Sequence, residues 1–301
     1  MEHITGLVAP VVTPMHSDGS LRLELAGQIV NHLERSGVAG VFVCGSTGEG
    51  PSLSIAERED TAEAFAEAAR GRLRVIIHVG HNALGEARKL AAHAQKLAAD
   101  AIAMSPPSYF KPTNAQTVAR CIRDVSDAAP ELPIYYYHIP VLTGVHVPMI
   151  ELLRIAQTEC PSLAGVKFTL EDVMDLQQCV AFAGGRYDML FGRDEMLLSA
   201  LVVGVRGAIG STYNYAAPLY VRMINAFERG ELAEARSLQH SATQLVDVVH
   251  RHRGPACHKA MMKFVGIDCG PCRLPLVPLT AEEEKELEAD LREIGFFEWI
   301  G

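Results

Sequence analysis

The sequence predicts an α/β protein of the (β/α)8 barrel class with a C-terminal helical extension. Three observations predict it: short apolar runs alternate with stretches of helical length, these runs number eight, and polar residues with reactive side chains follow the ends of the runs. At 301 residues the chain could hold two average domains, but one barrel of this class commonly reaches that length. Its 49% hydrophobic residues are ample for a large core.

Eight strands are expected, each a short run rich in β-branched or other apolar residues. In order they cover residues 6–12, 40–44, 74–79, 101–104, 134–137, 164–168, 187–191 and 207–210. A doubly wound sheet would carry a glycine-rich turn after its first strand, and the segment from Pro10 to Pro14 contains no glycine. Eight strand–helix repeats therefore favour a closed barrel.

The predicted helices are equally distinct. The helix over 54–70 opens with Ser54 as N-cap and Glu57 three positions later, the pattern of a capping box. Other helices are expected over 82–98, 213–229, 232–251, 256–265 and 280–294. We expect residues 1–229 to form the catalytic barrel and 230–301 a helical extension packed on it, because no linker rich in Gly, Ser or Pro separates them.

Charge and cysteine usage limit the class of partner and the compartment. The net charge of −9 and the absence of a basic run argue against nucleic-acid binding. No signal-peptide pattern opens the chain, and no apolar run approaches the roughly 20 residues that span a bilayer, so no membrane association is expected. Seven scattered cysteines, an odd number, suit a reducing compartment. We expect a cytoplasmic protein.

Cys269-Gly-Pro-Cys272 has the spacing of a thioredoxin-like redox motif, which requires its first cysteine at the start of a helix. Pro275 and Pro278 follow where that helix would run, so an extended loop with free thiols is predicted. A zinc site would need two further ligands, and Cys257 and His258 are adjacent rather than spaced as a second pair. No metal is expected, and the role of the cysteine pair stays open.

Lys167 is the residue that most strongly indicates a catalytic role. It ends the apolar run Ala-Gly-Val-Lys-Phe over 164–168, where a buried strand is expected. Lysine is rarely buried without a partner, and burial favours the neutral amine, a nucleophile that condenses with carbonyl groups. The segment alone also allows a strand-end lysine that reaches solvent or a carboxylate. A Schiff-base enzyme is the more specific of the two hypotheses.

The loop Gly-Ser-Thr-Gly-Glu-Gly over 45–50 lies between a strand and a helix. Its small residues let backbone N–H groups approach an anion, and the hydroxyl groups of Ser46 and Thr47 add donors. The loop lacks the lysine of a phosphate-binding P-loop, so it favours a carboxylate over a nucleotide. A turn that serves only chain reversal is the alternative.

Three tyrosines at 135–137 end the fifth strand, and alternation should place two on one face and one on the other. Tyr137 lies nearest the carboxyl end, where a phenol beside an amine can exchange protons during imine formation. Tyr135 and Tyr136 are assigned to packing. His138 is expected to line the site with its hydrogen bonds satisfied rather than to act as a base.

Four segments together carry a family resemblance: Gly-Ser-Thr-Gly-Glu at 45–49, Tyr-Tyr-Tyr-His-Ile-Pro-Val-Leu-Thr-Gly at 135–144, Gly-Val-Lys-Phe at 165–168 and Gly-Ser-Thr-Tyr-Asn at 210–214. Their order and their strand positions resemble the N-acetylneuraminate lyase branch of the dihydrodipicolinate synthase superfamily. The similarity spans nearly the whole chain. The resemblance implies a (β/α)8 barrel and a class I aldolase that uses neither metal nor cofactor.

In that resemblance Lys167 forms an imine with a 2-keto acid and Tyr137 transfers protons during carbon–carbon cleavage. Ser46, Thr47 and the neighbouring backbone at Gly48 would hold the pyruvate carboxylate. Ser46 and Tyr109 would extend the proton relay, with Tyr109 serving a neighbouring subunit. The expected assembly is a homotetramer built as a dimer of dimers.

The resemblance further implies a subsite for the polyhydroxylated tail of sialic acid, formed by Thr169, Gly192, Asp194, Glu195, Gly210 and Ser211. Carboxylates suit that role because they accept hydrogen bonds from hydroxyl groups. A solvated acidic pair that caps the next helix is the alternative for Asp194 and Glu195. The expected reaction is reversible cleavage of N-acetylneuraminate to pyruvate and N-acetylmannosamine.

Departures from the family pattern keep other substrates open. Val-Leu-Thr at 141–143 stands where the synthase branch carries an arginine, which disfavours lysine biosynthesis. Ser108, Phe110 and Arg193 also differ from relatives around the aldehyde pocket. The alternatives are an aldolase or dehydratase for another 2-keto acid, such as a 2-keto-3-deoxy sugar acid, and, more distantly, a non-catalytic barrel that binds a keto acid.

Overall fold

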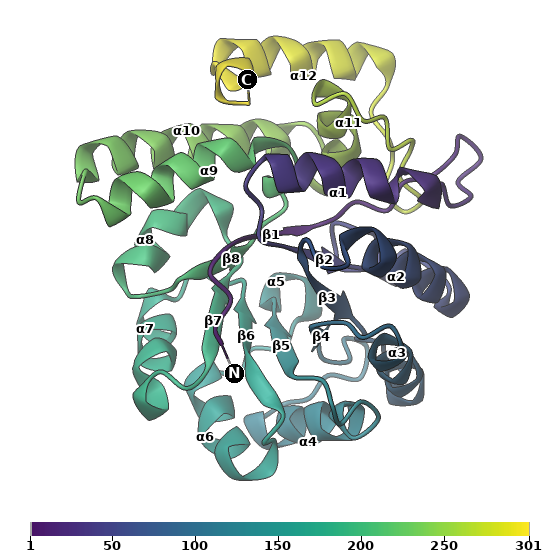
Figure 1. Ribbon diagram of the computed structural model, residues 1–301, viewed down its shortest axis with the longest axis vertical. Helices are drawn as coiled ribbons and strands as arrows, with labels where there is room; N and C mark the ends of the chain where they lie inside the picture. Colours follow the sequence, from purple (N-terminus) through teal and green to yellow (C-terminus); the bar gives the residue numbers. More distant parts are fainter. Residues whose placement is uncertain (1, 301) are drawn as a thin grey trace.

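The computed structural model of the protein describes residues 2–300 and contains a closed barrel of eight parallel strands (Figure 1). Each strand pairs with the next along the chain, and the first pairs with the eighth. The strands are β1 (Gly6–Pro10), β2 (Gly40–Val43), β3 (Arg74–His78), β4 (Ala101–Met104), β5 (Ile134–His138), β6 (Leu163–Phe168), β7 (Asp188–Phe191) and β8 (Gly207–Ile209). The predicted fold class is confirmed.

Strand boundaries agree with the sequence prediction to within two residues. The largest difference is at β1, which ends at Pro10 instead of residue 12. Its neighbour β2 ends at Val43, and Cys44 then turns into the left-handed region with φ 59°. Val12 consequently has no partner in the ladder, although it remains buried.

Helices surround the barrel and continue beyond it. They are α1 (Ala26–Arg35), α2 (Ile55–Ala69), α3 (Leu84–Lys96), α4 (Ala115–Ser126), α5 (Pro140–Thr143), α6 (Met149–Glu159), α7 (Val173–Ala181), α8 (Leu197–Val202), α9 (Tyr213–Glu228), α10 (Leu232–Arg251), α11 (Cys257–Phe264), α12 (Ala281–Glu293) and α13 (Phe296–Trp299). The predicted capping box at Ser54 is present, and Thr280 caps α12 in the same way. Short 3-10 turns η1 (Leu23–Leu25), η2 (Gly50–Ser52), η3 (Phe182–Gly184), η4 (Asp194–Met196) and η5 (Gly254–Ala256) complete the chain.

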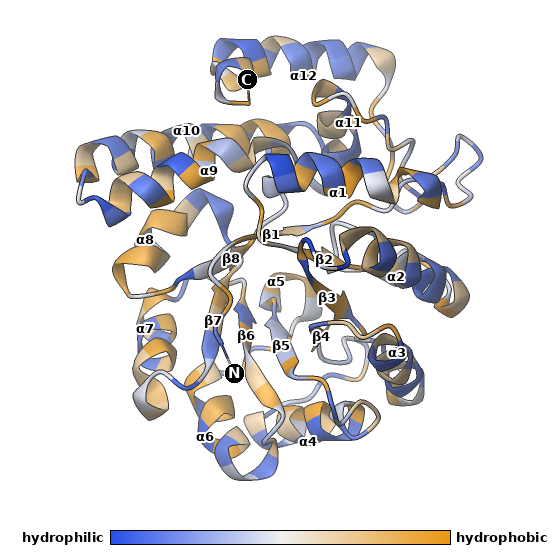
Figure 2. Ribbon diagram, viewed as in Figure 1, coloured by the Kyte–Doolittle hydropathy of each residue, from blue (hydrophilic) through white to orange (hydrophobic). Residues whose placement is uncertain are grey.

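Two apolar clusters form the core. The smaller fills the barrel interior and includes Phe42, Tyr135 and Tyr137. The larger lies between strands and helices and includes Tyr136 and Phe168. The three tyrosines therefore divide as strand alternation predicts, two inward and one outward. Figure 2 shows hydrophilic residues along the helices, strongly so on α12, whose first turn carries three glutamates.

The C-terminal helices pack against the barrel rather than apart from it. Helix α10 packs along α9, and α12 packs on α10 (Figure 1). The segment between α11 and α12 returns to the barrel, where Met15 N–H donates to the Cys269 carbonyl at 3.0 Å. This segment is the extended loop predicted around Cys269 and Cys272. Within residues 2–300, none of the helices has the length and apolar character to cross a membrane.

Candidate active site

Lys167 lies at the carboxyl end of β6 with only 3% of its surface exposed. Its Nζ sits 3.9 Å from the centre of the Tyr137 ring and 4.4 Å from that of Phe42. No carboxylate within residues 2–300 lies within ion-pair distance of this ammonium group. Aromatic faces attract a cation but leave an amine lone pair free to react once the proton departs. The alternative of a solvent-exposed lysine is wrong.

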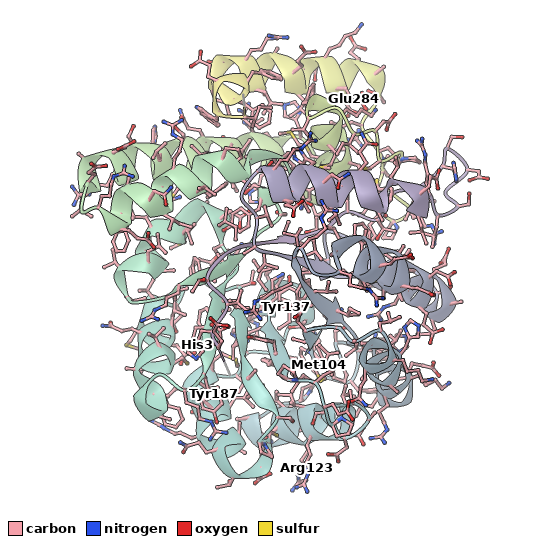
Figure 3. The ribbon with its side chains drawn as sticks, in the orientation of Figure 1. His3, Met104, Arg123, Tyr137, Tyr187 and Glu284 are labelled. Carbon is pink, nitrogen blue, oxygen red and sulfur yellow. The ribbon has the colours of Figure 1, made fainter. Side chains whose placement is uncertain are left out.

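Tyr137 stands directly beside Lys167, because the two residues are partners in the β5–β6 ladder. Its ring packs edge-on against Phe42 and His78, with centroid distances of 5.8 and 5.9 Å. Figure 3 shows Tyr137 near the centre of the barrel. An amine and a phenol from adjacent strands thus share one enclosed space, the arrangement needed for proton exchange during imine chemistry.

Phe42 and His78 form the wall opposite Lys167, and neither residue was predicted from the sequence. The Ser105 backbone N–H donates to Nε2 of His78 at 3.1 Å. Burial lowers the pKa of His78 well below the usual histidine range, aided by the nearby charges of Arg58 and Lys167. His78 is therefore a neutral wall residue. The signal that could have found both residues is their inward position at the ends of β2 and β3.

The loop after β2 is a tight turn held by its own backbone. Glu49 N–H donates to the Ser46 carbonyl and Gly50 N–H to the Gly45 carbonyl, both at 3.0 Å. Gly50 lies so close to the Cys44 carbonyl that a Cβ atom at this position would overlap it. Ser46 and Thr47 remain partly exposed at the tip of the turn.

Asp194 is buried, with 5% of its surface exposed, and is not half of a solvated pair. Its Oδ2 accepts hydrogen bonds from the Thr212 N–H at 2.9 Å and the Thr212 hydroxyl at 2.6 Å. Among the described residues its Oδ1 has no hydrogen-bond partner, and it lies against Gly210, where a Cβ atom would overlap the carboxylate. Burial raises the pKa of Asp194 to about 6, partly opposed by the Thr212 hydrogen bonds.

Glu195 has a different environment from Asp194. It is partly exposed, and Arg193 Nη1 approaches it to 3.7 Å while Nη2 of the same arginine lies 2.5 Å from Glu171. Arg193 thereby places a positive charge between the two carboxylates and reduces the negative potential around Glu195. From the sequence, Arg193 was identifiable only as a departure from relatives, because its partner Glu171 belongs to a different βα loop.

The structure brings most of the predicted tail-binding residues together. Gly192, Asp194, Glu195 and Ser211 line one cavity of about 140 Å³, together with residues of α10 and α11 that include His250 and His258. Thr169 is next to Gly192, and its buried hydroxyl has no partner within residues 2–300. The contribution of α10 and α11 to this cavity was not predicted, since histidine on a helix carries no specific signal.

Tyr109 lies outside the enclosed space, with 80% of its surface exposed, and its ring contacts that of Phe110 at 5.1 Å between centroids.

His138 faces the helix layer and packs on Tyr136 and Phe168. Its Nδ1 has no partner within residues 2–300, so the expectation of a satisfied histidine lining the site is wrong. Alternation on β5 turns residue 138 to the side opposite Tyr137.

The Cys269 and Cys272 thiols are not in the environment typical of a reactive cysteine pair. All seven cysteines are free thiols. Burial raises the pKa of Cys269 to about 12 and also raises that of Cys272, whereas a reactive cysteine needs a lowered pKa. Within residues 2–300, no group of three or more His, Cys, Asp or Glu side chains is placed to hold a metal ion.

Fold and site define a (β/α)8 barrel protein with a buried lysine beside a tyrosine at the carboxyl ends of its strands, where active sites of this fold lie. The chain matches the Dihydrodipicolinate synthetase family over residues 3–294. It belongs to that family.

Several relatives of the chain within this family are N-acetylneuraminate lyases. The chain is 43% identical to the N-acetylneuraminate lyase of Rattus norvegicus over 99% of its own length and 95% of the relative's. The human N-acetylneuraminate lyase is 41% identical, with 97% and 93% covered. Among solved structures, the Proteus mirabilis N-acetylneuraminate lyase superposes with a TM-score of 0.95 at 36% identity, covering 98% of this chain and 100% of the other.

Proposed function

We propose that this protein is a class I aldolase that reversibly cleaves N-acetylneuraminate to pyruvate and N-acetylmannosamine. The observation that carries the proposal is the Lys167 ammonium, which is 3% exposed and enclosed by the Tyr137 and Phe42 rings, with no carboxylate partner in the described part of the chain. Similarity to curated N-acetylneuraminate lyases over nearly the whole chain supports the substrate. A Ruminococcus gnavus sialic acid aldolase, solved also as a catalytic lysine mutant, is 30% identical.

The reaction follows from the groups present. The Lys167 amine adds to the C2 carbonyl of the substrate, and loss of water gives an imine. Tyr137 accepts the proton of the C4 hydroxyl as the C3–C4 bond breaks, and the bonding electrons pass into the imine to form an enamine. Protonation at C3 and hydrolysis release pyruvate and restore the amine. No cofactor is required, because the imine formed on Lys167 takes up the electron pair of the C3–C4 bond.

The remaining groups have supporting roles in this proposal. Ser46, Thr47 and the backbone at Gly48 bind the carboxylate, and Ser46 extends the proton relay with a Tyr109 supplied by a neighbouring subunit. Thr169, Gly192, Asp194, Glu195, Gly210 and Ser211 bind the sugar tail. Oδ1 of Asp194 and the Thr169 hydroxyl support this assignment, because both are buried polar atoms that form no hydrogen bond within residues 2–300.

We also propose that residues 1–229 are the catalytic barrel, that 230–301 are its packed extension, and that the protein works in the cytoplasm as a homotetramer. Seven free thiols support a reducing compartment.

Borohydride trapping tests the imine. Incubation of the protein with pyruvate and borohydride should add one reduced pyruvyl group to the peptide that contains Lys167, and Lys167→Ala should not be labelled there. Tyr137→Phe should still be labelled, because the amine remains, but should lose about 10²-fold or more in cleavage rate. An unlabelled Lys167 peptide from active protein would contradict the mechanism.

A substrate panel tests the sugar. N-acetylneuraminate and 2-keto-3-deoxy sugar acids should be compared by kcat/KM for pyruvate release. We expect N-acetylneuraminate to be preferred. Turnover of a deoxy sugar acid without turnover of N-acetylneuraminate would favour the alternative aldolase or dehydratase.

A further inference from the structure

A buried ion pair joins the C-terminal extension to the loop after β2. The Lys259 Nζ on α11 lies 2.7 Å from Oε1 of Glu49, and the two side chains are 5% and 3% exposed. Burying a charged pair forfeits the hydration of both ions, and an apolar pair of similar volume often stabilises a fold as well. A buried pair is therefore poorly explained by stability alone, and its geometry indicates another role.

Both carboxylate oxygens of Glu49 are used. Oε2 accepts the Arg273 backbone N–H at 2.7 Å, while Oε1 faces Lys259. Lys259 in turn donates to the Pro271 carbonyl at 2.7 Å. Helix α11 and the loop that follows it thus both contact the Glu49 carboxylate, which lies more than 200 positions earlier in the chain.

The Arg273 side chain fixes the same loop to two further parts of the barrel. Its guanidinium donates to Glu57 at 2.9 Å through Nη1 and to the Gly19 carbonyl at 2.7 Å through Nη2. Glu57 belongs to the capping box of α2. The segment that carries Pro271 and Arg273 is therefore held at the start of α2 and at the β1–α1 connection. From this fixed position the Arg273 backbone N–H contacts Glu49.

Glu49 transmits this position to the tip of the loop. Its own N–H closes the turn on the Ser46 carbonyl at 3.0 Å, and the Thr13 hydroxyl donates to the neighbouring Gly48 carbonyl at 2.6 Å. Glu49 has a left-handed backbone, with φ 56°, which a non-glycine residue keeps only where its surroundings impose it. A shift of the Glu49 carboxylate would therefore displace Ser46 and Thr47.

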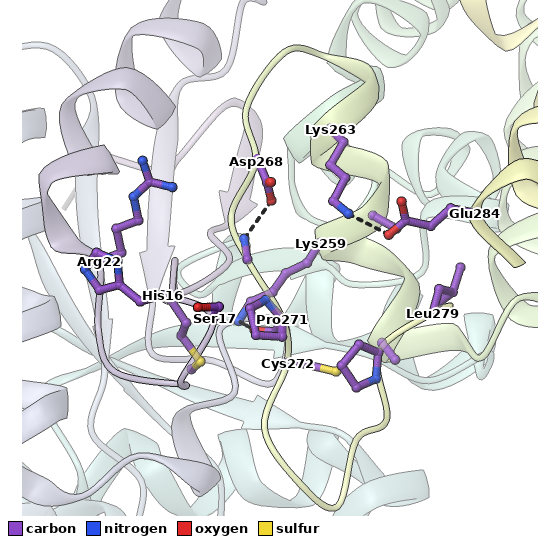
Figure 4. A pocket seen from close by; sticks show the side chains of 15 residues that line it. His16, Ser17, Arg22, Lys259, Lys263, Asp268, Pro271, Cys272, Leu279 and Glu284 are labelled. Carbon is purple, nitrogen blue, oxygen red and sulfur yellow. Dashed lines mark hydrogen bonds and ion pairs between the residues drawn. The ribbon is translucent and has the colours of Figure 1, made fainter. Parts of the chain in front are cut away.

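We infer that Lys259 is a positioning residue for the reaction: through its ion pair with Glu49 it holds the 45–48 loop in the geometry that binds the substrate carboxylate. The inference rests on the proposed function, because that function assigns the carboxylate to this loop. A cavity of about 580 Å³ lies beside the pair, lined by Lys259, Pro271 and Cys272 (Figure 4). The Lys259 side chain therefore has open space on one side, and the Glu49 ion pair and the Pro271 carbonyl are the contacts that hold it.

The test compares Lys259→Met with Lys263→Met. Lys263 lies one turn further along α11 and pairs with Glu284 at 2.6 Å, but its side chain is 38% exposed. The pyruvate concentration that gives half-maximal borohydride labelling of Lys167 is measured together with the melting temperature. We expect Lys259→Met to raise this concentration about tenfold with labelling still complete at saturation, and Lys263→Met to leave it within twofold.

Glu49→Gln and the double variant that combines it with Lys259→Met complete a double-mutant cycle. Glu49→Gln should raise the half-saturating concentration similarly, and the double variant should raise it no more than the larger single change, since the two residues act through one contact. Glu49→Gln supplies the readout if Lys259→Met does not fold. Half-saturation within twofold of wild type in every folded variant, whatever the loss of melting temperature, would overturn the inference. Failure of wild-type protein to be labelled would instead overturn the proposed function beneath it.

Discussion

Asp194 titrates in a range that is accessible to experiment. Its pKa is raised by burial to about 6, above the value of 3.8 expected for an exposed aspartate. The folded state therefore binds more protons than the unfolded state between about pH 4 and pH 6, and stability falls as pH rises through that window. The shift of about two units corresponds to at most about 3 kcal/mol.

The prediction concerns Asp194→Asn, which keeps an acceptor for Thr212 but cannot ionise. The free energy of unfolding of wild type relative to this variant should decrease between pH 4 and pH 6 and stay constant above pH 7. Urea denaturation of both proteins across this range measures it. A difference that does not vary with pH would show that Asp194 is not perturbed in the folded protein.

Gly210 makes a second residue-scale prediction, because its Cα lies against the Asp194 carboxylate. Gly210→Ala should destabilise the fold by about 1–3 kcal/mol through overlap with Asp194 and should raise KM for N-acetylneuraminate. Gly85→Ala is the control, since Gly85 is exposed at the start of α3 with open space around its Cα. Equal effects of the two substitutions on stability would argue against crowding at Asp194.

At the scale of elements, sequence pattern predicts best where one periodicity governs a segment. The strand alternation at Tyr135, Tyr136 and Tyr137 gave the inward and outward faces correctly, and Ser54 with Glu57 marked the start of α2. Lys167 was identifiable because a charge in an apolar strand is costly. Each of these signals lies within a few residues of the chain.

Contacts between distant elements were not predictable in the same way. Glu49 and Lys259 are 210 positions apart in sequence, and each is an ordinary charged residue in its own segment. The same applies to Arg193, whose partner Glu171 comes from another loop. The barrel brings such residues together through closure and helix packing, and no single-segment pattern records that placement.

The capping box of α2 yields a prediction for an element. Ser54→Ala removes the acceptor for the Glu57 N–H at 3.2 Å and should lower the free energy of unfolding by about 1 kcal/mol. Thr280→Ala, at the equivalent position of α12, should cost a similar amount. Chemical denaturation of the two variants measures both costs, and a Ser54→Ala protein as stable as wild type would refute the role of the cap.

At the scale of the whole molecule, exposed apolar side chains gather on the loop after β4 and on the short helix α5 within the loop after β5. Tyr109, Phe110, Val141 and Leu142 are all more than 60% exposed. The two loops lie against each other, since Lys111 packs on Gly144. Exposed apolar clusters of this kind commonly mark subunit interfaces. The patch stands at the end of the barrel where Lys167 lies, so a subunit docked there would be next to the active site.

Phe110→Asp should therefore weaken subunit association and lower the cleavage rate together. A charge at the centre of an apolar contact carries a desolvation cost, so light scattering should find a species smaller than the tetramer proposed for wild type. The cleavage rate should fall in parallel, because the proposed contribution of a neighbouring subunit's Tyr109 is lost, whereas Phe110→Leu should preserve both the assembly and the rate. Diluting wild-type protein should reproduce the loss of rate at the concentration where the assembly dissociates. Full activity of a monomer would remove Tyr109 from the proton relay.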